Sequence, residues 1–285
     1  MKYAALFLVF VMLFAGWNGS LRASPEKQTV ESADSVALAF SVEGKGEPAL
    51  VFVHCWCCDQ SYWRNQVGEF SKSHMVVAID LGGHGESGMN RQNWTIESFG
   101  QDVVAVVDKL GLEKVILIGH SMGGAVIIDA AKRMPDRVLA LIGVDTYQDL
   151  EREIPEEARA QWLAPFKTDF ATTTKGFVRG MFPDNADSAL VKQVANDMAS
   201  APPQVGIGAM ESMLGYKTVA ALEGLKIPLY AINADRFPTN VEAGKRRAYA
   251  FVVKYVPGRG HFVMLEDPKE FNRLLAETIK EIEGR

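Results

Sequence analysis

The strongest chemical signal in this sequence is a serine placed where a strand pattern meets a helix pattern. Ser121 lies in the stretch Gly119-His120-Ser121-Met122-Gly123, which follows the apolar run "VILI" and leads into "AVIIDAA". A G-x-S-x-G stretch in that context predicts a sharp turn that exposes the serine hydroxyl at the N-terminus of a helix. A serine hydroxyl is a weak nucleophile until a neighbouring base takes its proton. The sequence must therefore also supply a base.

Five histidines are candidates for that base, and His261 is the one we predict. It follows the final strand pattern through "PGRG", a loop whose two glycines allow an imidazole to reach the edge of a sheet. We assign packing or surface positions to the others, which are His54, His74, His84 and His120.

Short apolar runs that alternate with helical patterns indicate how these residues are positioned. Four runs, at 49–54, 75–80, 114–120 and 138–145, are continuously apolar, as strands buried on both faces must be, and further strand signals occupy 227–234 and 251–257. Helical patterns include 96–111 and 268–283. The alternation predicts an α/β fold with a mostly parallel sheet and helices on both faces. Residues from about 149 to 217 contain only helical patterns and loops, which predicts an all-helical lid inserted after the sixth core strand.

Three motifs together resemble the α/β-hydrolase superfamily. Besides the serine turn, "DLGGHGESG" (80–88) is similar to the family's D-x-P-G-H-G-x-S loop, and "GHFVMLEDP" (260–268) is similar to its histidine segment. The resemblance covers about residues 35–285, and the motifs follow the family's order of nucleophile, acid and histidine. It implies a serine-nucleophile hydrolase domain over residues 24–285. We expect no cofactor.

The resemblance also suggests which carboxylate holds the histidine. In the family the acid comes just after the penultimate strand, the position of Asp235 in "INADRF". Asp145 follows the preceding strand and is the alternative, since some members of the family keep the acid there. Asp80 comes before the nucleophile and is expected to be structural. We predict Asp235, because its position and order fit the triad pattern.

The family's oxyanion hole carries over to two backbone N–H groups. One belongs to Met122, the residue after the nucleophile, and the other to Trp56, in the loop after the strand 49–54. These donors would bind the oxygen that becomes anionic when Ser121 attacks a carbonyl. Cys55 occupies a position where the family has glycine.

All three cysteines lie in that same loop, as Cys55, Cys57 and Cys58. A structural zinc site takes ligand pairs from two segments, and the second segment is missing here, so we predict no metal. A disulfide between Cys57 and Cys58, or between Cys55 and Cys57, remains an alternative in an oxidising compartment. We predict buried thiols that pack around the oxyanion turn.

The N-terminal stretch "MKYAALFLVFVMLFAG" places Lys2 before an apolar run shorter than a membrane span. We interpret residues 1–23 as a secretory signal peptide, with an uncleaved N-terminal anchor as the alternative. The protein is then exported, to a periplasmic or extracellular location, with membrane contact only through an uncleaved leader. The net charge of −5 gives no indication of a nucleic-acid partner.

Aromatic and methionine side chains in the helical segment predict an apolar wall above Ser121. The leading hypothesis is therefore a serine hydrolase that cleaves carboxylic esters of small to medium apolar substrates through an acyl-enzyme. Carbon–carbon bond or lactone hydrolysis with the same triad is an alternative, because a fold does not determine its substrate. A ligand-binding or signalling protein with little turnover is the alternative from a different class.

Overall fold

The computed structural model describes residues 26–284, so the predicted leader, residues 1–23, lies outside the described residues. Within this range eight strands form one sheet: β1 (Glu26–Glu31), β2 (Ala37–Glu43), β3 (Ala49–Val53), β4 (Val76–Ile79), β5 (Val115–His120), β6 (Val138–Val144), β7 (Leu229–Ala234) and β8 (Phe251–Val256). The spatial order is β1-β2-β4-β3-β5-β6-β7-β8. The β1/β2 and β2/β4 pairs are antiparallel, and every other pair is parallel.

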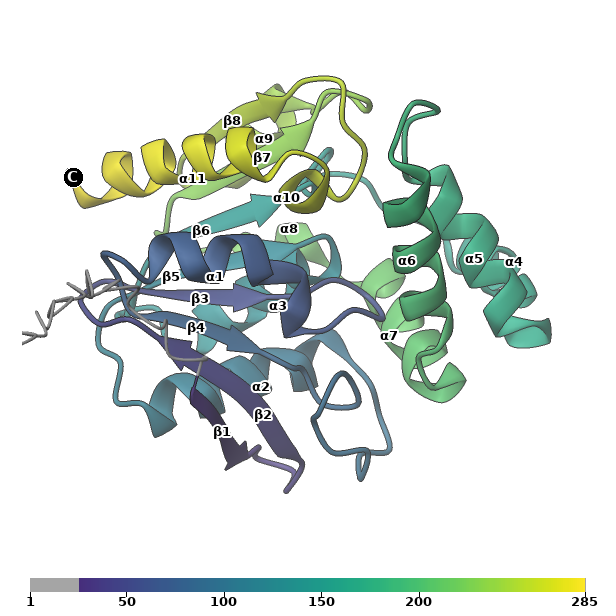
Figure 1. Ribbon diagram of the computed structural model, residues 1–285, viewed down its shortest axis with the longest axis horizontal. Coiled ribbons are helices and arrows are strands. Elements are labelled where there is room, and N and C mark those ends of the chain that lie inside the picture. The colour runs from purple at the N-terminus through teal and green to yellow at the C-terminus, as the bar shows by residue number, and fades with distance from the viewer. Residues whose placement is uncertain (1–25, 285) are drawn as a thin grey trace, which may run out of the picture.

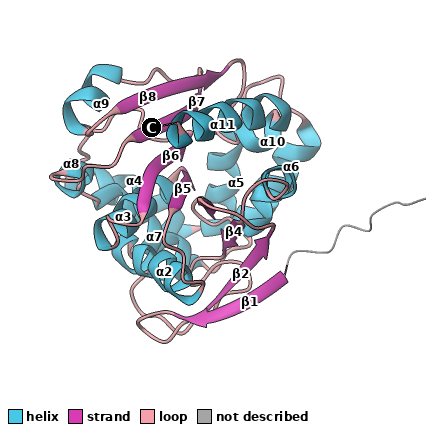
Figure 2. Cartoon of the chain, turned by 90° about the vertical axis from the view of Figure 1, so that its left-hand side faces the viewer, coloured by secondary structure: helices cyan, strands magenta, loops and turns pink. Residues whose placement is uncertain are grey.

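The helices outside the longest connection are η1 (Gln60–Trp63), α1 (Arg64–Phe70), α2 (Ile96–Lys109), α3 (Met122–Arg133), α9 (Val241–Arg247), α10 (Val263–Glu266) and α11 (Pro268–Glu283). Figure 2 shows the sheet nearly edge-on, with α2 and α3 on one face and α10 and α11 on the other. Burial on both faces explains the strand sequences, since every residue of β3, β4 and β5 is buried. The predicted α/β class, with a mostly parallel sheet between helices, is confirmed.

The connection from β6 to β7 contains five helices among the described residues: α4 (Glu156–Thr168), α5 (Phe170–Gly180), α6 (Ser188–Ala199), α7 (Pro203–Gly215) and α8 (Thr218–Leu222). We call residues 149–222 the helical insertion. Figure 1 shows α4–α7 grouped beyond the ends toward which the arrows of the parallel strands β3–β8 point. The insertion therefore stands at the carboxyl edge of the sheet, where open α/β sheets bind ligands.

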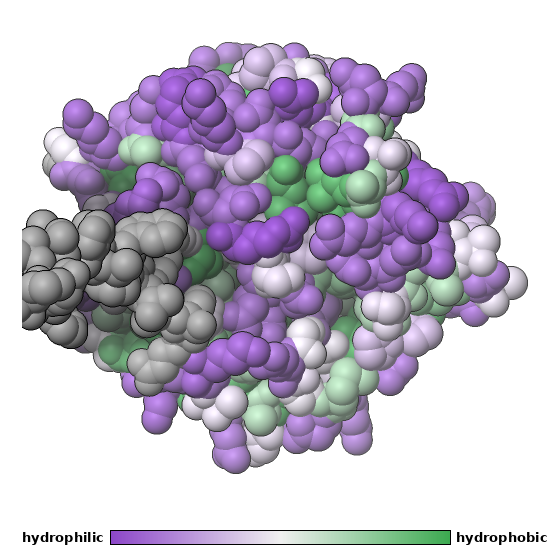
Figure 3. All heavy atoms as spheres, viewed as in Figure 1, coloured by the Kyte–Doolittle hydropathy of each residue, from purple (hydrophilic) through white to green (hydrophobic). Residues whose placement is uncertain are grey.

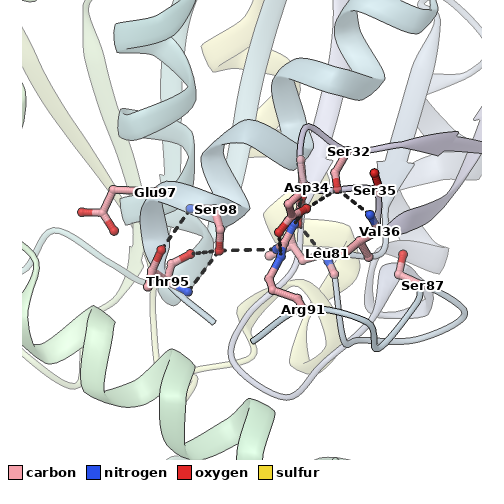
Figure 4. A network of polar contacts seen from close by, with 12 residues as sticks. Ser32, Asp34, Ser35, Val36, Leu81, Ser87, Arg91, Thr95, Glu97 and Ser98 are labelled. Carbon is pink, nitrogen blue, oxygen red and sulfur yellow. Dashed lines mark hydrogen bonds and ion pairs between the residues drawn. The ribbon is translucent and has the colours of Figure 1, made fainter. Parts of the chain in front are cut away.

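A buried arginine joins three separate segments near this edge of the sheet. The Arg91 side chain is 3% exposed, and its Nε and Nη2 donate to the two carboxylate oxygens of Asp34, at 2.7 and 2.9 Å. Its Nη1 and Nη2 donate to Asp102, at 2.9 and 2.6 Å, and Asp102 also accepts from the Gly82 N–H. Figure 4 shows Arg91 between the β1–β2 turn and the start of α2. The guanidinium thus joins the β1–β2 turn, the loop after β4 and helix α2.

Replacing this guanidinium is expected to destabilise the fold strongly. Arg91→Met leaves the fully buried Asp102 without its charge partner, and removing one member of a buried ion pair costs about 3–5 kcal/mol. Urea denaturation at neutral pH measures the loss. Arg273→Met is the matched control, because Arg273 is 52% exposed and its pairs with Glu270 and Glu277 lie on the surface. Exposed pairs contribute about 1 kcal/mol or less, so equal losses in the two variants would contradict this assignment.

The same network makes the stability of the folded state depend on pH in the acidic range. Hydrogen bonds from Arg91 lower the pKa of Asp34 to about 2. An unfolded aspartate titrates near pH 3.9, so the folded state holds this proton more weakly than the unfolded state does. The stabilisation by this pair is therefore present above about pH 4 and is lost as the pH falls toward 2.

The face drawn in Figure 3 is mostly hydrophilic, with small hydrophobic areas between charged side chains. Among the described residues, none of the helices has both the length and the apolar character that a membrane span requires.

Candidate active site

The turn around Ser121 has the geometry that the sequence predicts. Ser121 has a φ of +53°, in the region that non-glycine residues rarely adopt, and it is the residue before α3. A Cβ on Gly119 would lie 2.3 Å from the Gly123 carbonyl oxygen, and a Cβ on Gly123 would lie 2.7 Å from the Val53 carbonyl oxygen. Only glycine fits at these two positions, because the strand, the turn and the helix pass so closely. The hydroxyl-bearing residue is consequently held at the helix N-terminus.

His261 and Asp145 form a titratable pair at this edge of the sheet. The Nδ1 atom of His261 lies 2.5 Å from Oδ2 of Asp145, and the aspartate side chain is 5% exposed. The other carboxylate oxygen, Oδ1, accepts the backbone N–H of Ala234 at 2.8 Å. A carboxylate accepts hydrogen bonds, so Nδ1 carries the proton and Nε2 of the neutral ring is left as the acceptor. That tautomer is the one a general base for serine requires.

The prediction that Asp235 holds the histidine is wrong in its geometry. Asp235 is exposed, and its Oδ1 accepts the backbone N–H of Gly258 at 2.8 Å. It stabilises the loop that leads to His261 and does not contact the imidazole in the structure. The reason lies in the sheet order: β6 is the direct neighbour of β5, which ends immediately before Ser121, whereas β7 is one strand further away. The residue after β6 therefore lies closer to Ser121 than the residue after β7.

Backbone contacts fix the His261 loop from several sides. The Glu266 carboxylate accepts the N–H groups of Gly260 and Phe262, at 2.9 and 3.1 Å. The His261 N–H donates to the carbonyl oxygen of Met181, at the end of α5, at 3.0 Å. The helical insertion is thus attached directly to the loop that carries the imidazole. Glu266 is not singled out by the sequence, because a glutamate five residues after a histidine is not by itself a signal.

Trp56 and Met122, the predicted oxyanion donors, occupy suitable elements. Met122 is the first residue of α3, where backbone N–H groups have no partner within the helix. The Trp56 N–H makes no hydrogen bond to another residue within 26–284. The Trp56 indole donates to the carbonyl oxygen of Gly206 in α7 at 2.6 Å and packs against phenylalanines of the insertion, which are Phe166, Phe170 and Phe177. This loop therefore also joins the core to the helical insertion.

The cysteines of the loop are paired differently from the prediction. Cys55 and Cys58 form a disulfide. The sequence predicted free thiols, and neither of the two alternative pairings joined these two residues. Cys57 is free and buried. The Cys58 N–H donates to the Cys55 carbonyl oxygen, which closes a turn and places the two Cα atoms 5.3 Å apart. That separation is favourable for a disulfide, and it arises from the turn.

The remaining histidines and Asp80 have structural contacts. His54 Nε2 accepts the Leu81 N–H, and His84 Nδ1 lies 3.0 Å from the Gly82 carbonyl oxygen. His74 contacts Glu283, remote from the nucleophile in the chain and in the fold. The Asp80 carboxylate accepts from the backbone and side chain of Gln60 and from the Glu86 N–H. The expectation that Asp80 is structural is confirmed.

Ser121, Asp145 and His261 line one cavity of about 1060 Å³. Its wall on the helical insertion is mainly apolar and includes Trp162, Phe177, Met210, Met213 and Leu214. Its other wall, from the loops after β6 and β7, carries polar side chains, including Thr146, Gln148, Thr239 and Asn240, beside the apolar Phe237 and Pro238. The sequence predicts the apolar wall but gives no signal for the polar one, because polar residues in loops are ordinary. Within residues 26–284 no group of three or more His, Cys, Asp and Glu side chains could hold a metal ion.

Backbone strain is concentrated around this cavity. Asp145 and Tyr147 have φ values of +43° and +63°, and both line the cavity with Ser121. The Tyr147 hydroxyl donates to the Gly124 carbonyl oxygen at 2.7 Å, which holds the loop after β6 against α3. Residues in such conformations cost about 1–3 kcal/mol each and tend to occur at functional sites.

The family model for the alpha/beta hydrolase family matches residues 50–274. The chain therefore belongs to the alpha/beta hydrolase family.

Relatives of this chain include proteins named as a lactonase, an epoxide hydrolase and a "Putative esterase/lipase". It is 25% identical over 258 residues to "3-oxoadipate enol-lactonase 2" of Acinetobacter baylyi, covering 87% of this chain and 95% of that protein. Over a shorter region, 103 residues, it is 34% identical to human "Epoxide hydrolase 4", covering 35% of this chain and 28% of that protein. Among solved structures, a thermophilic esterase from Thermogutta terrifontis superposes with a TM-score of 0.78 at 24% identity, over 90% of this chain and 99% of that one. This last likeness shows the shared fold.

Proposed function

We propose that this protein is a serine hydrolase that cleaves carboxylic esters. The observation that carries the proposal is the 2.5 Å contact between His261 Nδ1 and Asp145 Oδ2 beside a cavity that also contains Ser121. In this mechanism Nε2 of His261 removes the proton of the Ser121 hydroxyl as the oxygen attacks the ester carbonyl. Asp145 keeps the imidazole in the correct tautomer and stabilises the imidazolium that forms.

The steps after attack use the same groups. The backbone N–H groups of Trp56 and Met122 bind the oxygen of the tetrahedral intermediate. The imidazolium gives its proton to the leaving alcohol, and the acyl group remains on Ser121 as an ester. Water, deprotonated by His261, then releases the acid and restores the hydroxyl.

The cavity suggests the substrate class. A volume of about 1060 Å³ suits a small to medium substrate, and the apolar wall from the insertion suits an alkyl or aryl group. Methionines in that wall, Met210 and Met213, would let it adapt to different groups. The polar wall, which includes Gln148 and Asn240, suits a substrate with a polar or hydrogen-bonding end. We therefore propose an ester with one apolar and one polar part, and a lid role for the helical insertion.

A lactone is the second candidate substrate. A lactone is a cyclic ester, so it needs the same attack by Ser121 and the same oxyanion donors. The specific observation in its favour is the similarity to an enol-lactonase over nearly the whole of both chains. A solved structure described as an N-acyl homoserine lactone degrading enzyme also shares the fold, with a TM-score of 0.76.

We also propose that the protein is exported by the leader in residues 1–23. The Cys55–Cys58 disulfide supports this, because disulfides persist in oxidising compartments and are rare in the cytosol.

The test combines turnover with identification of the modified residue. Purified protein is assayed on p-nitrophenyl esters from acetate to decanoate and on a set of aliphatic lactones. It is then treated with a fluorophosphonate, which phosphonylates activated serines, and digested for peptide mapping. We expect turnover of at least one series and a single adduct on the peptide that contains Ser121.

Two other outcomes would change the conclusion. An adduct on a different residue, with turnover intact, would overturn the role of Ser121. Absence of both turnover and adduct would overturn the hydrolase proposal and would favour the ligand-binding alternative.

A further inference from the structure

The proposed mechanism does not use His120, a buried titratable residue beside the reacting groups. It ends β5, immediately before Ser121, and its side chain is fully buried. Its Nε2 atom lies 2.8 Å from the backbone carbonyl oxygen of His261. His120 therefore contacts His261, the proposed base. The next residue in the chain, Ser121, bears the hydroxyl that is the proposed nucleophile.

The contact defines the protonation of the imidazole. A carbonyl oxygen only accepts hydrogen bonds, so Nε2 of His120 must carry the proton. Nδ1 is then the unprotonated nitrogen of a neutral ring. It is buried and has no hydrogen-bond partner among the described residues.

The surroundings of His120 keep the ring neutral. Its ring packs against Trp63, at 6.4 Å between centroids, and against Phe262, at 5.3 Å. Burial lowers the pKa of His120 well below its usual range, and the neighbouring imidazoles of His261 and His54 act in the same direction. A second proton on Nδ1 would place a charge in this apolar enclosure with no partner.

Neutrality matters because of what lies next to the ring. The centroids of His120 and His261 are 4.7 Å apart. When His261 becomes an imidazolium, a charged His120 would repel it at short range and low dielectric, whereas a neutral one does not. His120 can therefore donate a hydrogen bond to the His261 backbone without opposing the charge that develops during the reaction.

The other backbone contacts of the loop show what His120 adds. Glu266 accepts the N–H groups on either side of His261, and the Met181 carbonyl oxygen accepts the N–H of His261 itself. These contacts come from α10 and from the helical insertion. His120 alone among these groups belongs to the strand that leads into Ser121, so it sets the base relative to the nucleophile.

We propose that His120 is a positioning residue whose Nε2–H fixes the backbone of His261 against the strand that carries Ser121. The inference rests on the proposed function, because positioning matters only if His261 acts as a base for Ser121.

The test compares two replacements of nearly equal length. His120→Gln keeps an N–H donor at about the reach of Nε2, whereas His120→Met has a similar unbranched shape and no donor. A misplacement of about 1 Å can cost about 100-fold in rate, so we expect His120→Met to lower kcat about 10- to 100-fold. KM should change little, since His120 does not line the cavity. His120→Gln should recover most of the lost kcat.

A purely structural role predicts a different pattern. It would lower the melting temperature of both variants and leave kcat per folded molecule alike in the two. Equal kcat values for the Gln and Met variants, or a loss confined to KM, would overturn the proposal. An inactive wild-type protein would overturn both this inference and the proposed function, whereas active wild type with equivalent variants would overturn only the role of His120.

A measurement on the wild-type protein keeps the inference testable if the Met variant fails to fold. In a spectrum of protein with ¹⁵N-labelled histidine, we expect His120 to be protonated at Nε2 only and not to titrate between pH 5 and 8. A proton at Nδ1, or titration of His120 in that range, would overturn the proposal.

Discussion

Asp145→Asn is expected to lower kcat about 10³–10⁴-fold while the protein stays folded. The amide has nearly the shape of the carboxylate, but its NH₂ group can face Nδ1 of His261 and favour the wrong tautomer. The negative charge that stabilises the imidazolium is also lost. Because the carboxylate does not bind substrate in the proposed mechanism, KM should change much less than kcat. Steady-state kinetics on the best ester substrate measures both.

Asp235→Asn is the matched control for that experiment. Asp235 is exposed, and its carboxylate accepts a hydrogen bond from the Gly258 N–H. An amide oxygen can accept the same hydrogen bond. We expect kcat close to that of the wild type and a stability loss of about 1 kcal/mol or less. The opposite pattern, with Asp235→Asn inactive and Asp145→Asn active, would show that Asp235 is the acid. It would also require the His261 loop to move during the reaction.

Ser121→Ala is expected to have the largest effect on activity, a fall in kcat of ~10⁵–10⁶-fold. The residual rate would come from the oxyanion donors and from binding, because the covalent path is closed. Alanine adopts the φ of +53° no more easily than serine does, so the fold should keep its stability. Turnover of p-nitrophenyl esters and the melting temperature together test this.

The control for this variant is Ser61→Ala, in η1. Ser61 is exposed and does not line the cavity, so full activity is expected. Wild-type turnover by Ser121→Ala would contradict an acyl-enzyme on Ser121 and would leave direct attack by water as the remaining route. The fluorophosphonate adduct should disappear in Ser121→Ala and persist in Ser61→Ala.

The sequence predicts the turn at Ser121 because that turn is encoded locally. Gly119 and Gly123 are required by close approaches that glycine alone permits, and they flank Ser121 within five residues. The same holds for His261, whose loop follows the last strand directly. Strands β3, β4, β5 and β7 are predicted because their burial on both faces produces mostly apolar runs.

Two features are missed, each for its own reason. Strands β1 and β2 form a hairpin at the edge of the sheet, and β1, with the sequence "EKQTVE", has no apolar run to reveal it. The Cys55–Cys58 disulfide depends on a turn that brings those two sulfurs together, and the spacing of three cysteines in four positions does not specify which pair is joined.

By itself the sequence determined the fold class and identified Ser121 and His261 as the candidate nucleophile and base, since each depends on a short stretch whose backbone geometry follows from its own residues. It also narrowed the candidates for the triad acid to residues that follow a strand later in the chain than Ser121. Only the tertiary structure shows that Asp145, and not Asp235, contacts His261, because that contact depends on which strand lies beside β5. The sheet order places β6 there, and the Asp145 carboxylate contacts His261 although the two residues are 116 positions apart in the sequence.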